Sequence, residues 1–127
     1  MPDQQSHEQA AKRFLALYND IPENHPEGRV LALFYCALHL IETVAATEGV
    51  HNRNHPEREG FVRKHRMWKH YRPLLEASEH ARYLAGGRFT MNSPQIHEQL
   101  RKRRLKALEE WSEVYTSAGA SKKSPEP

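Results

Sequence analysis

The sequence predicts an all-α protein, an up-and-down bundle of four to five helices that forms a single domain over residues 1–116. Apolar residues recur at steps of three and four through most of the chain, the period of a helix with one buried face. Clusters of Pro, Gly and Asn divide these stretches into segments of helical length, and no alternating stretch predicts a strand. The 127 residues suffice for one compact core and are too few for two.

We expect the first helix at residues 6–18. Ser6 and Gln9 have the spacing of a capping box, in which two side chains satisfy the unpaired backbone groups of a helix start. The apolar residues that follow recur at helical spacing. Residues 19–28 contain two prolines and predict a loop.

An apolar run without a helix breaker predicts a central helix at residues 29–48. It should end at Gly49, because glycine tolerates the positive φ common at helix C-termini. A third, short helix is expected at residues 56–64, where Asn54 can cap the helix and Pro56 occupies an early helical position.

A fourth helix is expected at about residues 67–85, with its start bent or delayed by Pro73. The last helix is predicted to begin where Ser93 caps Pro94 at the first helical position. Its apolar stripe runs to Tyr115, and its opposite face is basic.

Composition indicates a soluble, cytoplasmic protein with no membrane span. Hydrophobic residues make up 38% and charged residues 28% of the chain. The apolar run at residues 30–38 is far shorter than the roughly 20 residues that cross a bilayer, and residues 1–9 lack the layout of a secretory signal. The lone Cys36 is expected to be a small core residue, and the polar tail at residues 117–127 is expected to be disordered.

A cluster of histidines and cations lies at residues 51–72. This segment holds seven Lys or Arg and two Glu, a local charge of +5, together with four of the nine histidines. Arginine binds phosphate oxygens with a planar fork, and histidine exchanges a proton near neutrality. Arg58, His65 and His55 are therefore the candidate catalytic residues for RNA chemistry, if they line one groove. The alternative is a solvated helix face that happens to contain these residues.

The central helix also carries His39 and Glu42 three residues apart. Such a pair is half of a metal-binding set in helical carboxylate bundles, but no second inward pair is present, so no metal or other cofactor is expected. We expect instead that both side chains form hydrogen bonds with Arg82 or Tyr83, or with the active groove, because buried polar groups usually have partners. Arg53 is a further candidate pocket residue.

Two other features have both a functional and a structural interpretation. The basic run in residues 101–106 can contact phosphates or can simply form a soluble face. Trp68, Trp111 and Tyr115 can stack on unpaired bases or belong to the core. We expect Trp111 to belong to the core.

The motifs between residues 29 and 89 together resemble the HEPN domain family, small helical proteins of prokaryotic defence and toxin systems. The resemblance is to a short bacterial branch with an aromatic-Ala-Leu-His-x-x-Glu pattern, a His-x-x-Arg pattern and a Tyr-x-x-Leu, Ser and Ala-Arg-Tyr signature. The matching residues are Tyr35, Ala37, Leu38, His39, Glu42, His55, Arg58, Tyr71, Leu74, Ser78, Ala81, Arg82 and Tyr83.

The resemblance implies a helical bundle that commonly dimerises, and a metal-independent endoribonuclease that cuts single-stranded RNA by His/Arg acid-base chemistry. Its Arg and His motifs meet across the dimer groove, with Arg58 on the phosphate and His65 or His55 as acid or base. Glu59 follows Arg58, where the family motif usually has Asn, Asp or His. A carboxylate at this position weakens the field of the arginine.

Other family members are non-catalytic, so the alternative is a HEPN module that binds RNA, a nucleotide or a protein partner. A third possibility is a structural helical adaptor. The expected partners are a second copy of the chain, RNA or a nucleotide, and an antitoxin or a larger nuclease complex.

Overall fold

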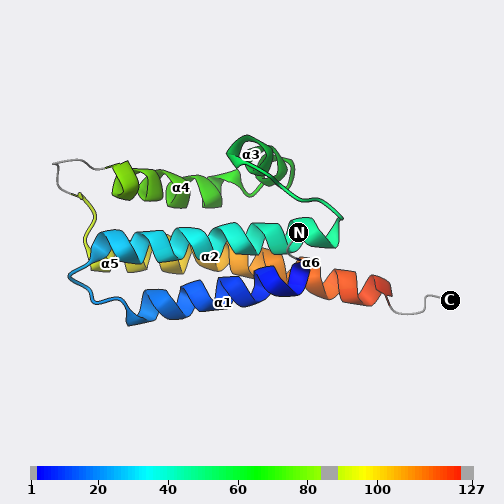
Figure 1. Ribbon diagram of the computed structural model, residues 1–127, viewed down its shortest axis with the longest axis horizontal. Helices are drawn as coiled ribbons and strands as arrows, with labels where there is room; N and C mark the ends of the chain where they lie inside the picture. Colours follow the sequence, from blue (N-terminus) through cyan, green and yellow to red (C-terminus); the bar gives the residue numbers. More distant parts are fainter. Residues whose placement is uncertain (1–2, 84–88, 124–127) are drawn as a thin grey trace.

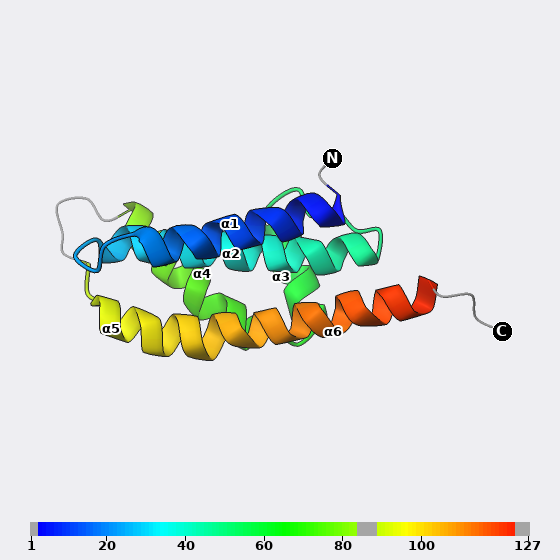
Figure 2. The ribbon, with the colours of Figure 1, turned by 90° about the horizontal axis from the view of Figure 1, so that it is seen from below.

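The computed structural model describes residues 3–83 and 89–123, with side chains described up to residue 117. It confirms the all-α bundle, and the described residues contain no strand. The helices are α1 (Gln4–Asp20), α2 (Pro26–Thr47), α3 (His55–Lys64), α4 (Trp68–Tyr83), α5 (Ser93–Gln95), the π-helix η1 (Ile96–Leu105) and α6 (Lys106–Lys123). Figure 1 shows α2 between α1 and α4, and Figure 2 shows α5, η1 and α6 as one long rod.

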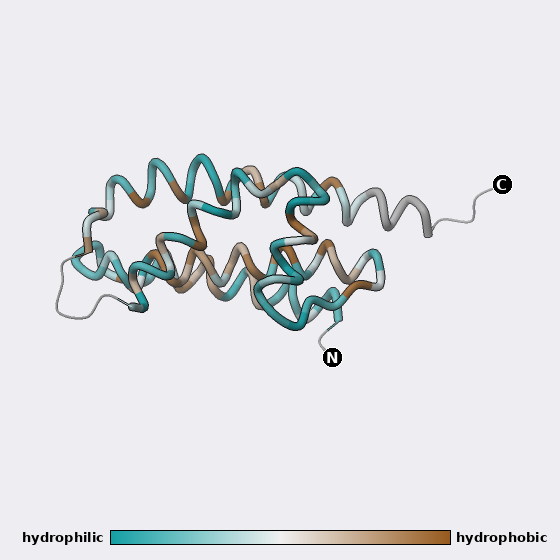
Figure 3. Tube along the Cα trace, turned by 90° about the horizontal axis from the view of Figure 1, so that it is seen from above, coloured by the Kyte–Doolittle hydropathy of each residue, from teal (hydrophilic) through white to brown (hydrophobic). Residues whose placement is uncertain are grey.

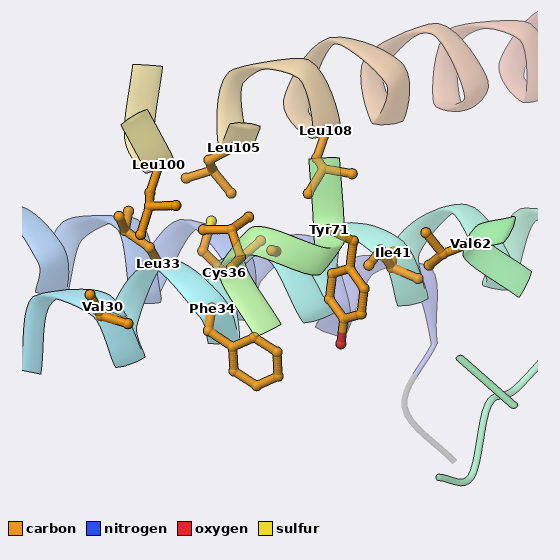
Figure 4. Close-up of a cluster of buried hydrophobic side chains, with 14 of the residues drawn as sticks. Val30, Leu33, Phe34, Cys36, Ile41, Val62, Tyr71, Leu100, Leu105 and Leu108 are labelled. Carbon is orange, nitrogen blue, oxygen red and sulfur yellow. The ribbon is translucent and has the colours of Figure 1, made fainter. Parts of the chain in front are cut away.

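The apolar α2 is the central element of the core. Figure 4 shows its side chains, among them Leu33 and Ile41, opposite Leu105 and Leu108 of the last rod. The expected core position of Cys36 is confirmed, since it is 2% exposed. Hydrophobic positions of η1 and α6 face α2 while their hydrophilic positions face outward (Figure 3). Trp111 packs against this core, as expected.

By length and composition α2 could also cross a membrane, a property that the expectation of no span overlooked. Within its most apolar 18-residue window, 61% is buried inside the protein. A core helix of a bundle passes the same test of length and composition.

Helix ends follow local chemistry, with two corrections to the sequence analysis. The cap of α1 is Asp3, whose side chain accepts a 2.8 Å hydrogen bond from Ser6 N, so Ser6 is inside the helix. The cap of α5 is Asn92, and Ser93 instead donates from Oγ to Glu23 O at 2.6 Å. The predicted Asn54 cap of α3 is confirmed, because its side chain accepts from the backbone N–H three residues on.

The last rod contains a π-helical stretch that the sequence analysis did not anticipate. Its buried residues are Ile96, Leu100 and Leu105, so the apolar stripe has a step of five between the last two. An α-helix would turn Arg103 or Arg104 toward the core at that step. The wider π turn, with Lys106 N donating to Arg101 O, buries Leu105 instead.

Pro73 lies inside α4 and does not delay its start at Trp68. A proline has no backbone N–H, so the carbonyl four residues earlier loses its helical donor. That carbonyl belongs to Lys69, and Arg104 Nη1 donates to it at 3.3 Å. A side chain from η1 thus replaces a hydrogen bond that the proline removed from α4.

The domain is helical beyond its expected end. Helix α6 continues to Lys123, so the expectation of disorder from residue 117 is wrong up to that residue. Residues 124–127 lie outside the described residues. The same holds for residues 84–88, which include the expected end of the fourth helix at residue 85.

Candidate functional site

A buried ion pair joins α2 to α3. Arg58 Nε donates to Glu42 Oε2 at 2.9 Å, and the two side chains are 10% and 3% exposed. Asn52 also donates to the Glu42 carboxylate, from Nδ2 at 3.0 Å and from its backbone N–H at 3.3 Å. Of the partners expected for Glu42, the structure therefore shows a residue of the candidate active groove, Arg58, and not Arg82 or Tyr83.

His39, the other member of the expected pair, has a histidine partner. Its Nδ1 lies 3.0 Å from His7 Nδ1 of α1, so one ring donates and the other accepts. Burial, and next the charge of His7, lower the pKa of His39 to about 4. Burial also lowers the pKa of His7. Both rings are therefore neutral at physiological pH and hold α1 against α2.

His55 and Arg58 do lie together at the start of α3. Arg58 Nη1 is 3.5 Å from His55 Nδ1, and because a guanidinium only donates, the imidazole accepts. His55 is exposed, whereas Arg58 is buried. Arg53, just before the helix, is ion-paired with Glu57 at 2.8 Å on the surface.

His65 lies in a different environment. Its Nδ1 shares a 2.9 Å hydrogen bond with the Tyr115 hydroxyl, and its Nε2 is 3.0 Å from Glu48 Oε2. Its ring also packs between Phe61 and Trp111, and its side chain is 8% exposed. The expected common groove of Arg58 and His65 is thus not formed within one chain. Arg58 at the start of α3 faces α2, whereas His65, just past its end, faces α6.

Two adjoining cavities lie beside the ion pair. The first, which we call the arginine pocket, has a volume of about 340 Å³. The second, the aromatic pocket, has a volume of about 500 Å³. The arginine pocket is lined by Phe34, Tyr35, Leu38, Arg53, Asn54, His55, Arg58 and Arg82. The aromatic pocket is lined by His55, Pro56, Glu59, Trp68, Tyr71, Arg72, Leu75, Glu76, Glu79, Arg82 and Tyr83. His55 and Arg82 line both cavities.

Two residues that line the aromatic pocket each have a buried polar atom that forms no regular hydrogen bond, Tyr71 Oη and Arg82 Nε. The Arg58 guanidinium lies near the Tyr71 hydroxyl and acts to lower its pKa. Figure 4 shows the Tyr71 hydroxyl directed away from Leu105 and Leu108. Burial raises the pKa of Tyr71 to about 12, so this hydroxyl keeps its proton and can donate. Arg82 has no carboxylate within ion-pair distance among the described residues, and its guanidinium lies 5.3 Å from the Phe34 ring centroid. Buried polar groups usually have partners, and because both of these atoms are donors, an acceptor suits both of them.

Aromatic rings border the same cavity. Tyr83 is 76% exposed, which is unusual for a large aromatic side chain, and the Arg82 guanidinium lies 5.6 Å from its ring centroid. Trp68 is half-buried, with the Arg63 guanidinium 4.4 Å from its ring centroid. Arg63 is ion-paired with Glu59, whereas Arg82 is not in any ion pair among the described residues. An exposed ring beside such a cation suits a ligand that has both a flat base and a phosphate.

Sequence reasoning missed Asn52, because an asparagine in a turn is ordinarily a turn former. The chain matches no family model, no curated protein and no solved structure. The described residues also contain no group of three or more His, Cys, Asp or Glu arranged to hold a metal ion. The function therefore has to be argued from the geometry of this chain alone.

Proposed function

We propose that the protein is a non-catalytic HEPN-like module that binds single-stranded RNA at the arginine and aromatic pockets. The observation that carries this proposal is the pair of unpaired buried atoms, Tyr71 Oη and Arg82 Nε, in one cavity. Both are donors, and a phosphate group supplies acceptor oxygens to both. His55 and the exposed ring of Tyr83 border the same cavity and supply a further polar contact and a stacking surface.

The state of the two expected catalytic residues favours binding over cleavage. The Glu42 carboxylate neutralises Arg58, so this guanidinium contributes less field to a phosphate than an unpaired one. The His65 imidazole is enclosed by Glu48 and Tyr115 and does not line either pocket. Arg82 is the cation that remains available for a phosphate.

A second candidate function is the metal-independent endoribonuclease of a toxin or defence system. It is favoured by His55, an exposed imidazole that lines both pockets and lies 3.5 Å from Arg58. In this proposal His55 transfers the proton, and Arg82 stabilises the charge on the phosphorus. Under this second proposal the protein acts in the cytoplasm as a homodimer, and its partner is an antitoxin or a larger nuclease complex.

Fluorescence anisotropy with a labelled single-stranded RNA tests the binding proposal. Tyr71→Phe should weaken binding about tenfold or more, since a hydrogen bond to a charged group contributes about 1.5–3 kcal/mol. It should change the free energy of unfolding only slightly, because the Arg58 guanidinium near this hydroxyl forms its regular hydrogen bond with Glu42 instead. Arg82→Gln should also weaken binding, with Arg13→Gln on the exposed surface of α1 as its charge-matched control.

Tyr18→Phe is the matched control for the tyrosine. The Tyr18 hydroxyl shares a 2.9 Å hydrogen bond with His97, and neither residue lines the arginine pocket or the aromatic pocket. This variant should therefore lose stability and keep RNA affinity, the reverse of Tyr71→Phe. Equal RNA affinity in wild type, Tyr71→Phe and Arg82→Gln would refute the proposed site.

The two candidate functions separate when the same RNA is incubated with the protein in chelator. Intact RNA supports the binding module. Cleavage that persists in chelator, disappears in His55→Ala and survives in His65→Ala would instead establish the nuclease with His55 at its centre.

A further inference from the structure

Three basic side chains meet where the start of α4 packs against the end of η1. We call Lys69, His70 and Arg104 the basic seam. Arg104 Nη1 donates to the backbone carbonyl of Lys69 at 3.3 Å, which fixes the guanidinium at the first turn of α4. The pKa of His70 is lowered by burial and then by the positive charges of Lys69 and Arg104.

Two irregularities of the chain create the seam. Pro73 removes the helical donor of the Lys69 carbonyl, so this carbonyl is open to a side chain from another element. The π-helical stretch keeps Arg104 out of the core at the five-residue step between Leu100 and Leu105. The hydrogen bond from Arg104 to the Lys69 carbonyl depends on both features, because Pro73 leaves the acceptor open and the π-helical stretch keeps the donor outside the core.

The positive charge of the seam is not compensated within the described part of the chain. None of the ion pairs there includes Lys69, His70 or Arg104, although the exposed Arg63 of α3 and Arg72 of α4 are each paired with a glutamate four residues away. In addition, His70 Nδ1 is buried and has no hydrogen-bond partner. Like charges held together without a counter-charge are unfavourable, and a bound anion removes that cost.

We infer that the basic seam is a second phosphate-binding surface, which holds the sugar-phosphate backbone of an RNA whose base occupies the aromatic pocket. The inference rests on the proposed function. Trp68 lines the aromatic pocket and Lys69 is the next residue, so the pocket and the seam both include the first turn of α4. The seam binds phosphodiesters by charge and therefore without sequence preference.

The salt dependence of RNA binding tests this inference. For single strands, each phosphate contact adds about 0.7 to the slope of log affinity against log salt concentration. With an oligonucleotide of about 12 residues, the double variant Lys69→Gln/Arg104→Gln should lower the slope by about 1.4. The control Lys12→Gln/Arg13→Gln removes the same charge from the exposed surface of α1 and should lower it by less than half as much.

A mononucleotide separates the seam from the pockets. It fills the pockets without reaching the seam, so the double seam variant should bind it as tightly as wild type. The single variant Lys69→Gln keeps the hydrogen bond from Arg104 to the backbone carbonyl of residue 69, so it controls for a folding defect in the double variant. In this single variant the slope of log affinity against log salt concentration should fall by about 0.7. Equal slopes in the seam and control variants, or a loss of mononucleotide affinity in the seam variant, would overturn the inference.

A titration with inorganic phosphate, monitored through the NMR signals of the His70 ring, tests anion binding at the basic seam even if RNA does not bind. A saturable shift in wild type that is absent in Lys69→Gln/Arg104→Gln supports the seam as an anion site while the proposed function fails. No shift in wild type, together with no RNA binding, refutes both.

Discussion

Removal of the Glu42 carboxylate tests whether this group organises the region around the two pockets. In Glu42→Ala, Arg58 would remain buried without its counter-charge, and Asn52 would lose the acceptor of two hydrogen bonds at 3.0 and 3.3 Å. Breaking a buried ion pair from one side costs about 3–5 kcal/mol, because a charge is left uncompensated. We therefore expect a loss of that size in the free energy of unfolding.

The corresponding thermal shift follows from the length of the chain. Unfolding entropy is about 2.1 cal/mol/K per residue, so for 127 residues each kcal/mol lowers Tm by roughly 4 °C. Glu42→Ala should therefore lower Tm by about 10–20 °C. Urea unfolding followed by circular dichroism measures the free energy directly, and the thermal scan provides an independent value.

The double variant Glu42→Leu/Arg58→Met is the decisive control. It removes both charges and fills the space with apolar atoms, so it should be more stable than Glu42→Ala. The two single changes, Glu42→Leu and Arg58→Met, complete the cycle and should couple strongly. A loss below about 1 kcal/mol in Glu42→Ala, or a double variant as unstable as the sum of its single changes, would refute the reasoning.

Three further predictions concern local features. Gly49 has φ of 71°, so Gly49→Ala should lower the free energy of unfolding by about 1–2 kcal/mol. Gly60→Ala, inside α3 and with no atom within 4 Å of the new Cβ, should instead raise it by about 0.5–1 kcal/mol. Urea unfolding midpoints that shift in the same direction in the two variants would contradict this. The pKa of His39 is lowered from 6.5 to about 4, so the unfolded chain takes up the proton first and stability is lost as pH falls through this window. For this half-exposed ring we expect a loss of about 1–2 kcal/mol, reduced or absent in His39→Gln, and an unchanged pH slope in that variant would argue against it. Pro73→Ala restores the N–H that bonds the Lys69 carbonyl and should raise the free energy of unfolding by about 1–3 kcal/mol in urea titrations; a decrease would count against the account of α4.

Much of the fold could be predicted because its signals are local. The Asn54 cap and the end of α2 at Gly49 depend on residues within one turn, and both are as predicted. The capping residues of α1 and α5 were placed three and one residues too late, since Asp3 and Asn92 were not considered. Neighbouring polar residues compete for the same backbone groups, and the geometry of the preceding loop decides between them.

The candidate site was predicted in part. The sequence singled out His55, Arg58, Arg82 and Tyr83, which do line the two pockets. It placed His65 with them because six residues separate it from Arg58, but α3 ends at Lys64 and the ring turns toward Tyr115, fifty positions further on. Such a partner depends on where α6 packs, which no spacing within α3 records.

The amino-acid sequence by itself determined that this chain is a helical bundle with an apolar central helix, because hydrophobic period, caps and breakers act over a few residues. Only the tertiary structure decided that Glu42 neutralises Arg58, that Tyr71 and Arg82 present unpaired donors to one cavity, and that Arg104 reaches the carbonyl opposite Pro73. The first and the last of these are contacts between different helices, whereas Tyr71 and Arg82 both belong to α4 and residues of α3 complete the cavity that they line. Their distances depend on how the helices pack against one another, and packing is a property of the whole core.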